Sequence, residues 1–320
     1  MSPWPEPLAR AYAACESLAQ SHYENFPVAS RLLPAPMRPH VAAVYAFARV
    51  ADDFADEGTA SPAERQARLR DWQARLHRAV SVADEPVAAD PNGGREPRAA
   101  MDEYDLMFAA IGHTIRSCRL PVALFDDLLS AFGQDTMTTR YDSWRDVLDY
   151  CRRSANPVGR LVLRIAGRAT DELDRSSDAL CTALQLTNFW QDFGRDWRAG
   201  RLYVPREVLT ACGACEDELG GPHLSDAWAR AISACVDYTR RLFDDGRLVC
   251  DGVSGRLRYE LRFTWLGGYR MLDRVDAGRF DLMHVRPALG AGDLAHLVWR
   301  AAVWRRAKTP ASSGWRGAAA

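Results

Sequence analysis

The chain has little net charge, no long apolar run and no secretion signal. Its 320 residues carry a formal charge of −1, which gives no indication of nucleic acid or an anionic membrane as the main partner. No apolar stretch reaches the roughly 18 residues that a membrane-spanning helix needs. The N-terminus, MSPWPEPLAR, lacks the basic start and apolar run of a secretory signal. We therefore expect a soluble or peripheral protein in the cytoplasm.

Cysteine and lysine are scarce, and strand signals are poor. Eight cysteines spread over the length are too sparse for a disulfide framework, so we expect them to stay reduced. Cys212 and Cys215 form one C-x-x-C without a second pair at zinc spacing, which favours ordinary residues near a helix end over a metal or redox site. Lys308 is the only lysine, a bias that genomic base composition explains as well as function does. No series of alternating apolar runs ends in Asn-Gly or Asp-Gly turns.

Apolar residues instead recur at three- and four-residue spacing, which predicts helices through most of the chain. Hydrophobic residues make up 48% of the sequence, enough for a large core. We predict one all-α bundle domain over 1–305 with its site in the middle, a Pro/Gly-rich loop over 84–100 and a disordered tail over 306–320. The predicted helices span 8–24, 38–57, 62–82, 100–117, 121–132, 143–168, 172–196, 205–217, 226–250, 255–275 and 291–305.

One acidic cluster lies in the stretch YAFARVADDFADE. Four side chains at i, i+4, i+7 and i+11 share one helix face: Tyr45, Arg49, Asp52 and Asp56. Asp53 lies at the edge of this face. Like charges four residues apart repel one another, and a bound cation such as Mg²⁺, which prefers oxygen ligands, would relieve the repulsion. Taken alone, the cluster is equally compatible with a solvated helix end.

A second acidic cluster lies in LQLTNFWQDFGRDWRAGRLYVP. Four polar side chains fall within roughly 80° of one face of a single predicted helix: Gln185, Asn188, Asp192 and Asp196. Alone, they could form a charged stripe paired with neighbouring arginines. Two such clusters in one all-α chain, each beside arginine, favour a diphosphate bound through divalent metal ions, because departure of a diphosphate needs charge neutralisation.

The order of the motifs resembles that of the squalene/phytoene synthase family, the head-to-head isoprenoid synthases. The likeness runs from CESLAQSHYENFPVASRLLP to GGYRMLDRV and includes both acidic motifs, YCRRSANPVG and GRLYVP. It implies an all-α isoprenoid synthase fold with a central cavity and several Mg²⁺ ions beside the diphosphate. The predicted metal ligands are Asp52, Asp53, Asp56, Asn188, Asp192 and Asp196.

The resemblance also implies roles for other side chains. Positions near the diphosphate are matched by Tyr45, Arg49, Arg201 and Tyr269. An N-terminal flap that closes over the substrate is matched by His22 and Phe26. Positions lining the cavity are matched by Tyr150, Gly159 and Gln185. The predicted catalytic set comprises Asp52, Asp56, Asn188, Asp192, Asp196, Arg49 and Tyr150.

Two segments depart from the commoner family pattern. YCRRSANPVG, at 150–159, stands where phytoene and presqualene diphosphate synthases usually read Y-C-Y-x-V-A-G-x-V-G, and Gln191 replaces an Arg. This form, with ENFPVAS and NFWQD, resembles the bacterial hydroxysqualene synthases of hopanoid pathways. The resemblance implies that presqualene diphosphate is ionised, its cyclopropane opened and the cation captured by water, without NADPH.

The departing segment supplies polar groups near the expected cavity. Ser154 and Asn156 bring a hydroxyl and an amide that could hold a water molecule, so Asn156 is predicted to contact the substrate. Arg152 and Arg153 are either substrate contacts or surface ion-pair residues. No G-x-G-x-x-G follows a strand, so a dinucleotide site is unsupported.

Three other functions stay open. Within the family, the chain could be a presqualene diphosphate or phytoene synthase that joins two prenyl diphosphates. A di-iron carboxylate bundle would need Glu-x-x-His pairs, and no His lies three residues after a Glu. A non-catalytic helical partner would not need both acidic clusters. We expect the substrate to be handed over by a presqualene diphosphate synthase. Its low solubility favours peripheral contact with the inner membrane, although no helix of the sequence stands out as an anchor.

Overall fold

The structure, a computed structural model, describes residues 4–21, 32–56, 58–81 and 104–304, and these ranges form helices and turns without a strand. The all-α prediction is confirmed. The helices are α1 Glu6–Ser21, α2 Arg38–Asp56, α3 Pro62–Ser81, α4 Asp105–Cys118, α5 Ala123–Asp135, α6 Trp144–Ser154, α7 Asn156–Ile165, α8 Asp171–Gln191, α9 Phe193–Arg198, α10 Arg206–Cys212, α11 Asp226–Asp245, α12 Val249–Gly252, α13 Gly255–Ala277 and α14 Ala291–Ala302, with 3₁₀ turns at Glu216–Gly220 and Gly246–Leu248. The predicted flap residues His22 and Phe26, the loop 84–100 and the tail 306–320 lie outside the described residues.

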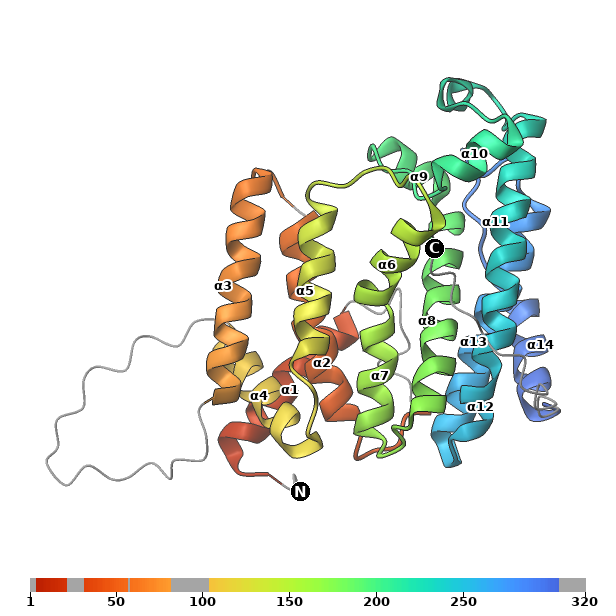
Figure 1. The fold of residues 1–320 in the computed structure, drawn as a ribbon. Coiled ribbons are helices and arrows are strands. Elements are labelled where there is room, and N and C mark those ends of the chain that lie inside the picture. The colour runs from red at the N-terminus through yellow and green to blue at the C-terminus, as the bar shows by residue number, and fades with distance from the viewer. Residues whose placement is uncertain (1–3, 22–31, 57, 82–103, 305–320) are drawn as a thin grey trace, which may run out of the picture.

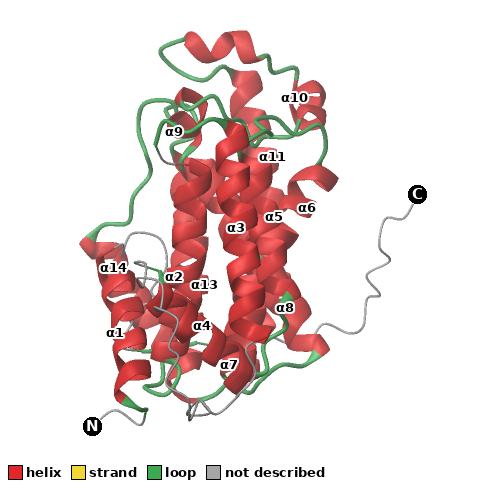
Figure 2. Cartoon of the chain, turned by 90° about the vertical axis from the view of Figure 1, so that its left-hand side faces the viewer, coloured by secondary structure: helices red, strands yellow, loops and turns green. Residues whose placement is uncertain are grey.

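The long helices lie side by side and follow one another across the bundle roughly in chain order (Figure 1). α8 lies inside the bundle, where it packs against α6, α7, α11 and α13. The short helices α9 and α10 lie together at one end of the bundle (Figures 1 and 2). Within the described residues, every helix is too short or too polar to cross a membrane.

The central helix α8 is fixed at its start and along its buried side. The Thr170 hydroxyl caps it by accepting the Leu173 N–H at 3.2 Å, and acidic residues fill its first turn, where they complement the helix dipole. Near its far end Trp190 is fully buried and donates its ring N–H to Thr239 at 2.9 Å. Truncating such a residue to Ala typically costs about 3–5 kcal/mol. This packing holds the C-terminal end of α8 in place.

Helix α2 separates apolar and charged side chains onto different faces. Ala43, Phe47 and Ala51 follow one another at four-residue spacing and are fully buried. The Phe47 ring lies 5.8 Å from that of Trp72 on α3 and 5.6 Å from that of Phe125 on α5. The charged end of α2 is thereby turned toward the same end of the bundle as α9.

Among the predicted helices that are interrupted or shortened, two have a clear local cause. The predicted helix 143–168 splits at Ala155 into α6 and α7, because Pro157 lacks the N–H that would continue α6. α6 begins where Ser143 and Asp146 form a capping box. The predicted helix 205–217 ends at Cys212, because Gly213 adopts the left-handed conformation at φ 69° and caps it.

Candidate functional site

Three helices place an acidic residue at their C-terminal ends, on one side of the bundle. Asp56 is the last residue of α2, Asp135 is the last residue of α5, and Asp192 caps α8. The C-terminal end of a helix carries partial negative charge and normally favours a cation. We call the region around these three residues the acidic end. It accumulates negative charge from both side chains and helix dipoles, an arrangement suited to bound cations.

The first predicted cluster lies at the end of α2. Arg49 reaches the Asp53 carboxylate at 2.5 Å and the Asp52 carboxylate at 3.6 Å. Burial raises the pKa of Tyr45, and the nearby Arg49 lowers it while Asp53 and Asp52 raise it further. The predicted face is therefore present, with Arg49 at its centre.

The second predicted cluster is not on one continuous helix. α8 ends at Gln191, Asp192 leaves the α conformation at φ −93° and ψ 11°, and α9 begins at Phe193. The prediction of a single helix over 172–196 is wrong at this point, because the apolar spacing continues through a backbone break that it does not reveal. Two of the predicted ligands nevertheless stay together, since the Asn188 amide donates to the Asp192 carboxylate at 3.2 Å.

Arg201 joins the two clusters. Its guanidinium lies 2.8 Å from the Asp56 carboxylate and 3.6 Å from that of Asp196. Gly200, at φ 82°, turns the chain back after α9, and the Arg201 N–H then donates to the Asp196 carbonyl at 2.8 Å. The two acidic clusters therefore lie on either side of one arginine. That they form one metal–diphosphate site stays a prediction.

Two residues of the acidic end were missed in the sequence. Asp135 accepts the Tyr150 hydroxyl at 2.7 Å, and Arg286 pairs with Asp192 through two nitrogens. Asp135 stands alone in GQDTMTTRY without a periodic acidic partner, so no spacing pattern pointed to it. Arg286 belongs to the irregular segment after α13. That segment is held to α8 and α9 by Gln191, which donates to the Pro287 carbonyl at 2.9 Å.

The segment after α13 also requires a glycine beneath it. A Cβ on Gly194 would come within 2.6 Å of the carbonyl oxygens of Leu282 and Met283. Arg198 donates to the Met283 carbonyl at 2.8 Å. Close backbone packing at Gly194 thus brings the segment with Arg286 over the second acidic cluster.

Burial, with a contribution from neighbouring acids, raises the pKa of several carboxyl groups. Burial, and after it the neighbouring Asp56, raise the pKa of Asp52 to about 6, although Arg49 lowers it. Burial likewise raises the pKa of Asp196 to about 6 and that of Asp135 to about 7, where Asp56 and Asp52 add to the effect. Burial and like charges both disfavour the ionised form, and a bound cation would restore it.

Whether these groups fit metal ions and a diphosphate can be judged from their unused atoms. Among the described residues, no three His, Cys, Asp or Glu side chains are gathered into a ready metal cage. Arginine side chains form ion pairs with the carboxylates instead. Within the same residues, the buried Asp135 Oδ1 and Arg201 Nε have no hydrogen-bond partner. The Asp135 oxygen can accept a cation and the Arg201 N–H can donate to an anion, as a metal ion bound together with a diphosphate would require.

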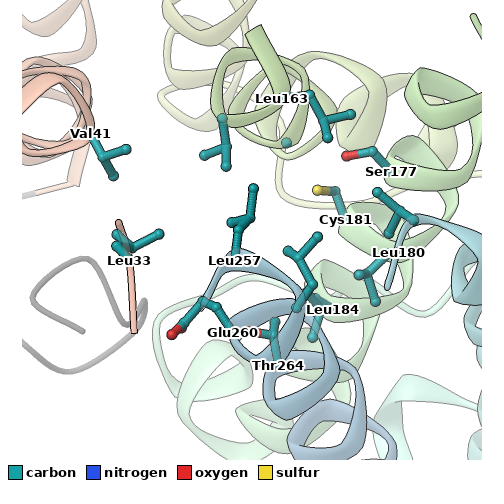
Figure 3. A pocket seen from close by; sticks show the side chains of 14 residues that line it. Leu33, Val41, Leu163, Ser177, Leu180, Cys181, Leu184, Leu257, Glu260 and Thr264 are labelled. Carbon is teal, nitrogen blue, oxygen red and sulfur yellow. The ribbon is translucent and has the colours of Figure 1, made fainter. Parts of the chain in front are cut away.

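An apolar cavity lies along α8, and Leu184 is the residue of its lining that comes nearest in the sequence to the second acidic cluster (Figure 3). Its empty volume is about 630 Å³, including the part open to solvent. Leu184 lines it one turn from Asn188, and Ser177 lies about 10 Å further along the helix axis. Figure 3 shows Leu33 and Val41 on the side opposite Ser177. The remaining lining is supplied by Gly159, Val162, Leu163, Leu180, Cys181, Val249, Leu257, Glu260, Leu261 and Thr264.

Gly159 matches its predicted place in this cavity. A Cβ there would come within 2.3 Å of Ser177 Oγ and 2.6 Å of Cys181 Sγ, so only glycine lets α7 approach α8 this closely. Tyr150 lies instead at the acidic end, with its hydroxyl on Asp135.

The other predicted contact residues lie in varied surroundings. The Asn156 amide oxygen accepts the Thr182 hydroxyl at 2.9 Å, which ties α7 to α8. The Tyr269 ring packs on Phe243 and Trp265. Gln185 is half-buried on α8, between Leu184 and Asn188 in the sequence. The roles predicted for these side chains remain predictions.

Two pairs from the sequence lie outside the acidic end. Arg152 and Arg153 both pair with Asp149, at 3.0 and 2.9 Å, which favours the ion-pair interpretation. Cys212 and Cys215 are free thiols at the end of α10 and the start of the following 3₁₀ turn.

The sequence of this chain is similar to those of several known proteins. A sequence profile described as squalene/phytoene synthase matches residues 19–299. A hydroxysqualene synthase of Zymomonas mobilis is 39% identical over 68% of this chain and 67% of its own length. A hydroxysqualene synthase of Sinorhizobium fredii is 34% identical over 76% of each chain.

Among solved structures, the squalene synthase HpnC of Alicyclobacillus acidocaldarius is similar. It is 39% identical, with a TM-score of 0.74 over 86% of this chain and 95% of its own.

Proposed function

The chain belongs to the squalene/phytoene synthase family, and we propose that within it the chain acts as a hydroxysqualene synthase. The substrate is presqualene diphosphate, and the products are hydroxysqualene and diphosphate. The observation that carries the proposal is that α8 holds Asn188 and Asp192 of the second acidic cluster at its C-terminal end and lines an apolar cavity up to Leu184, one turn earlier. The names of the similar hydroxysqualene synthases support the choice of product.

We further propose that divalent ions, Mg²⁺ by ligand preference, assist the reaction as a carbon–oxygen lyase. Their holders would be Asp52, Asp53, Asp56, Asn188, Asp192 and Asp196, with Asp135 beside them. When bound, such ions neutralise the charge that develops on a departing diphosphate.

The chain's own cations complete this neutralisation. Arg49 lies between Asp52 and Asp53, and Arg201 lies between Asp56 and Asp196, so both are positioned beside the proposed ligands. Arg201 Nε, which has no hydrogen-bond partner among the described residues, can donate to a diphosphate oxygen. Tyr150 positions the Asp135 carboxylate through its hydroxyl. In this proposal, these groups hold the leaving diphosphate at the acidic end.

The cavity then determines which molecules can react with the carbocation. Breaking the carbon–oxygen bond releases diphosphate and leaves a carbocation, whose cyclopropane ring opens. Water adds its oxygen to the resulting cation and loses one proton, so no reductant is consumed. Apolar walls from α7, α8 and α13 exclude other water molecules from the prenyl chains.

Ser154 is our candidate for holding the attacking water. Its hydroxyl oxygen is buried without a hydrogen-bond partner among the described residues. It lies four residues after Tyr150 and therefore on the same face of α6, one turn closer to Gly159 and the cavity. Asn156 is a weaker candidate, because its amide oxygen already accepts from Thr182. A Ser154→Ala variant should lose hydroxysqualene relative to other products without losing diphosphate release.

The test of the function is a product assay. The purified chain receives either presqualene diphosphate or farnesyl diphosphate, with Mg²⁺ and without NADPH. We expect hydroxysqualene from presqualene diphosphate and no product from farnesyl diphosphate. Presqualene diphosphate or phytoene formed from a linear diphosphate would instead support the runner-up, a prenyl transferase, because the acidic end alone would ionise either substrate.

A place in a reaction sequence follows from this substrate. A head-to-head synthase must supply presqualene diphosphate, and we propose that it hands this poorly soluble molecule over directly. Adding that synthase should raise the hydroxysqualene rate above the rate with the same concentration of free presqualene diphosphate. An unchanged rate would contradict direct transfer.

A further inference from the structure

Arg140 connects three segments of the chain near the acidic end. It lies between α5 and α6, in a segment that passes beside α9 (Figure 1). Its guanidinium forms an ion pair with the Glu216 carboxylate at 2.9 Å. Another of its nitrogens, Nη1, donates to the Gly200 carbonyl at 2.6 Å, and its Cζ lies 5.2 Å from the centroid of the Trp197 ring. One side chain thus links the segment after α5, the turn after α9 and the 3₁₀ turn after α10.

The Gly200 carbonyl belongs to the peptide unit that leads into Arg201. The N–H of the same unit, on Arg201, donates to the Asp196 carbonyl of α9 at 2.8 Å. Both polar groups of one planar peptide are therefore held, the oxygen by Arg140 and the N–H by α9. Gly200, at φ 82°, has more backbone freedom than any other residue would have there. Holding both groups fixes the direction in which the Arg201 side chain leaves the backbone.

The backbone that follows Arg201 is bound to the same segment between α5 and α6. The Leu202 N–H donates to the Thr139 carbonyl, and the Arg206 N–H donates to the Tyr141 carbonyl, both at 2.9 Å. These bonds hold the chain only after Arg201. The contact of the Gly200 carbonyl is therefore the one that fixes the turn before it to this segment.

The direction of the Arg201 side chain decides what its guanidinium contacts. It lies 2.8 Å from the Asp56 carboxylate and 3.6 Å from that of Asp196. Its buried Nε has no hydrogen-bond partner among the described residues. A rotation of the Gly200–Arg201 peptide would carry the guanidinium away from both carboxylates and turn this Nε elsewhere. The geometry of the acidic end thus depends on a contact made outside it.

We propose that Arg140 is a positioning residue for Arg201. Through the Gly200 carbonyl it holds the Arg201 guanidinium between the two acidic clusters, where it can receive a diphosphate. This role rests on the proposed function, because a diphosphate is the ligand that we assign to Arg201. Arg140 itself is bound to Glu216 and to a backbone carbonyl, so it acts through Arg201 and not on the substrate.

The test is calorimetric titration of the full chain with pyrophosphate in the presence of Mg²⁺, without an isoprenoid substrate. Arg140→Met keeps an aliphatic side chain but cannot donate, so it should bind pyrophosphate about tenfold more weakly. Arg140→Lys can still donate to the Gly200 carbonyl, although it loses the forked contact with Glu216, and should recover part of that affinity.

Arg164→Met is the matched control. Arg164 also pairs with a carboxylate, that of Asp174 at 2.8 Å, and also donates to a backbone carbonyl, that of Arg160 at 3.0 Å. Asp174 lies about 20 Å from Asn188 along the axis of α8. The control should therefore bind pyrophosphate like the unaltered chain.

A cycle of double variants separates positioning from a general effect on stability. Where Arg201→Met is already present, adding Arg140→Met should weaken binding little further, because the group that Arg140 positions is missing. Equal weakening in both backgrounds, or an unchanged affinity in Arg140→Met alone, would overturn the proposal. Circular dichroism verifies that each variant is folded. If Arg140→Met does not fold, Glu216→Gln loosens Arg140 without removing it and should weaken binding about two- to threefold.

The same titration distinguishes this role from the proposed function. If the unaltered chain does not bind pyrophosphate with Mg²⁺, the diphosphate site is wrong and the role of Arg140 falls with it. If the unaltered chain binds, and the variants at Arg140 and Arg164 bind equally well, only the positioning role is overturned.

Discussion

The acidic end and the apolar cavity share α8, yet they are built in opposite ways. Around Asn188 and Asp192 the helix ends among charged side chains, where Arg286 pairs with Asp192 and the Asn188 amide donates to the same carboxylate. From Leu184 to Ser177 the same helix lines a cavity with almost entirely apolar walls. The first region would ionise a diphosphate, and the second would protect the resulting cation. The region proposed to release the diphosphate and the region proposed to shield the carbocation thus lie a few turns apart on one helix.

The largest effect should come from the acidic end. Asp52→Asn and Asp192→Asn each keep the size of the side chain but remove a charge proposed to hold metal, so turnover should fall on the order of 1,000-fold at saturating Mg²⁺. Diphosphate release from presqualene diphosphate is the measurement. Asp237→Asn, at an exposed carboxylate that pairs with Arg240 on α11, is the control and should retain turnover. Full turnover in either site variant would contradict the assignment.

A smaller effect should follow from a polar group in the cavity. Leu184→Gln leaves the acidic residues untouched but places an amide against the prenyl chain and the cation, at a cost of about 1–3 kcal/mol for burial of an unpaired polar group. We expect turnover roughly ten- to a hundredfold lower. The stabilisation that Mg²⁺ and pyrophosphate together give the protein, measured by thermal denaturation, should stay unchanged. If that stabilisation is also lost, the two regions are not separable.

The pH dependence of stability should show a subtler effect. The pKa of Asp135 is raised to about 7, well above about 4 for an unfolded Asp, so the folded chain binds a proton that the unfolded chain lacks between these values. The free energy of unfolding should therefore rise as pH falls from about 7 toward 4. Without metal, the melting temperature of Asp135→Asn should vary less between pH 7.5 and 5.5, by about a few degrees, than that of the unaltered chain. Equal slopes would show that Asp135 does not titrate in this range.

Periodicity in the sequence predicted the helical bundle and the two acidic clusters, because the spacing of apolar and of acidic residues along a helix is a local property. It did not reveal the break at Asp192, since the spacing of Asn188 and Asp196 runs through it unchanged. Asp135 and Arg286 were beyond its reach for a different reason. Each reaches the site only through tertiary packing, Asp135 because α5 ends there and Arg286 because Gly194 admits the segment after α13.

The central claim is that the acidic end binds a diphosphate only together with divalent metal. The most direct measurement is thermal denaturation of the chain with pyrophosphate, with Mg²⁺, and with both. We predict stabilisation only with both ligands present, because neither alone balances the charges of the site, and loss of that stabilisation in an Asp52→Asn/Asp192→Asn variant. Equal stabilisation by pyrophosphate alone, or stabilisation that survives in the double variant, would contradict the account.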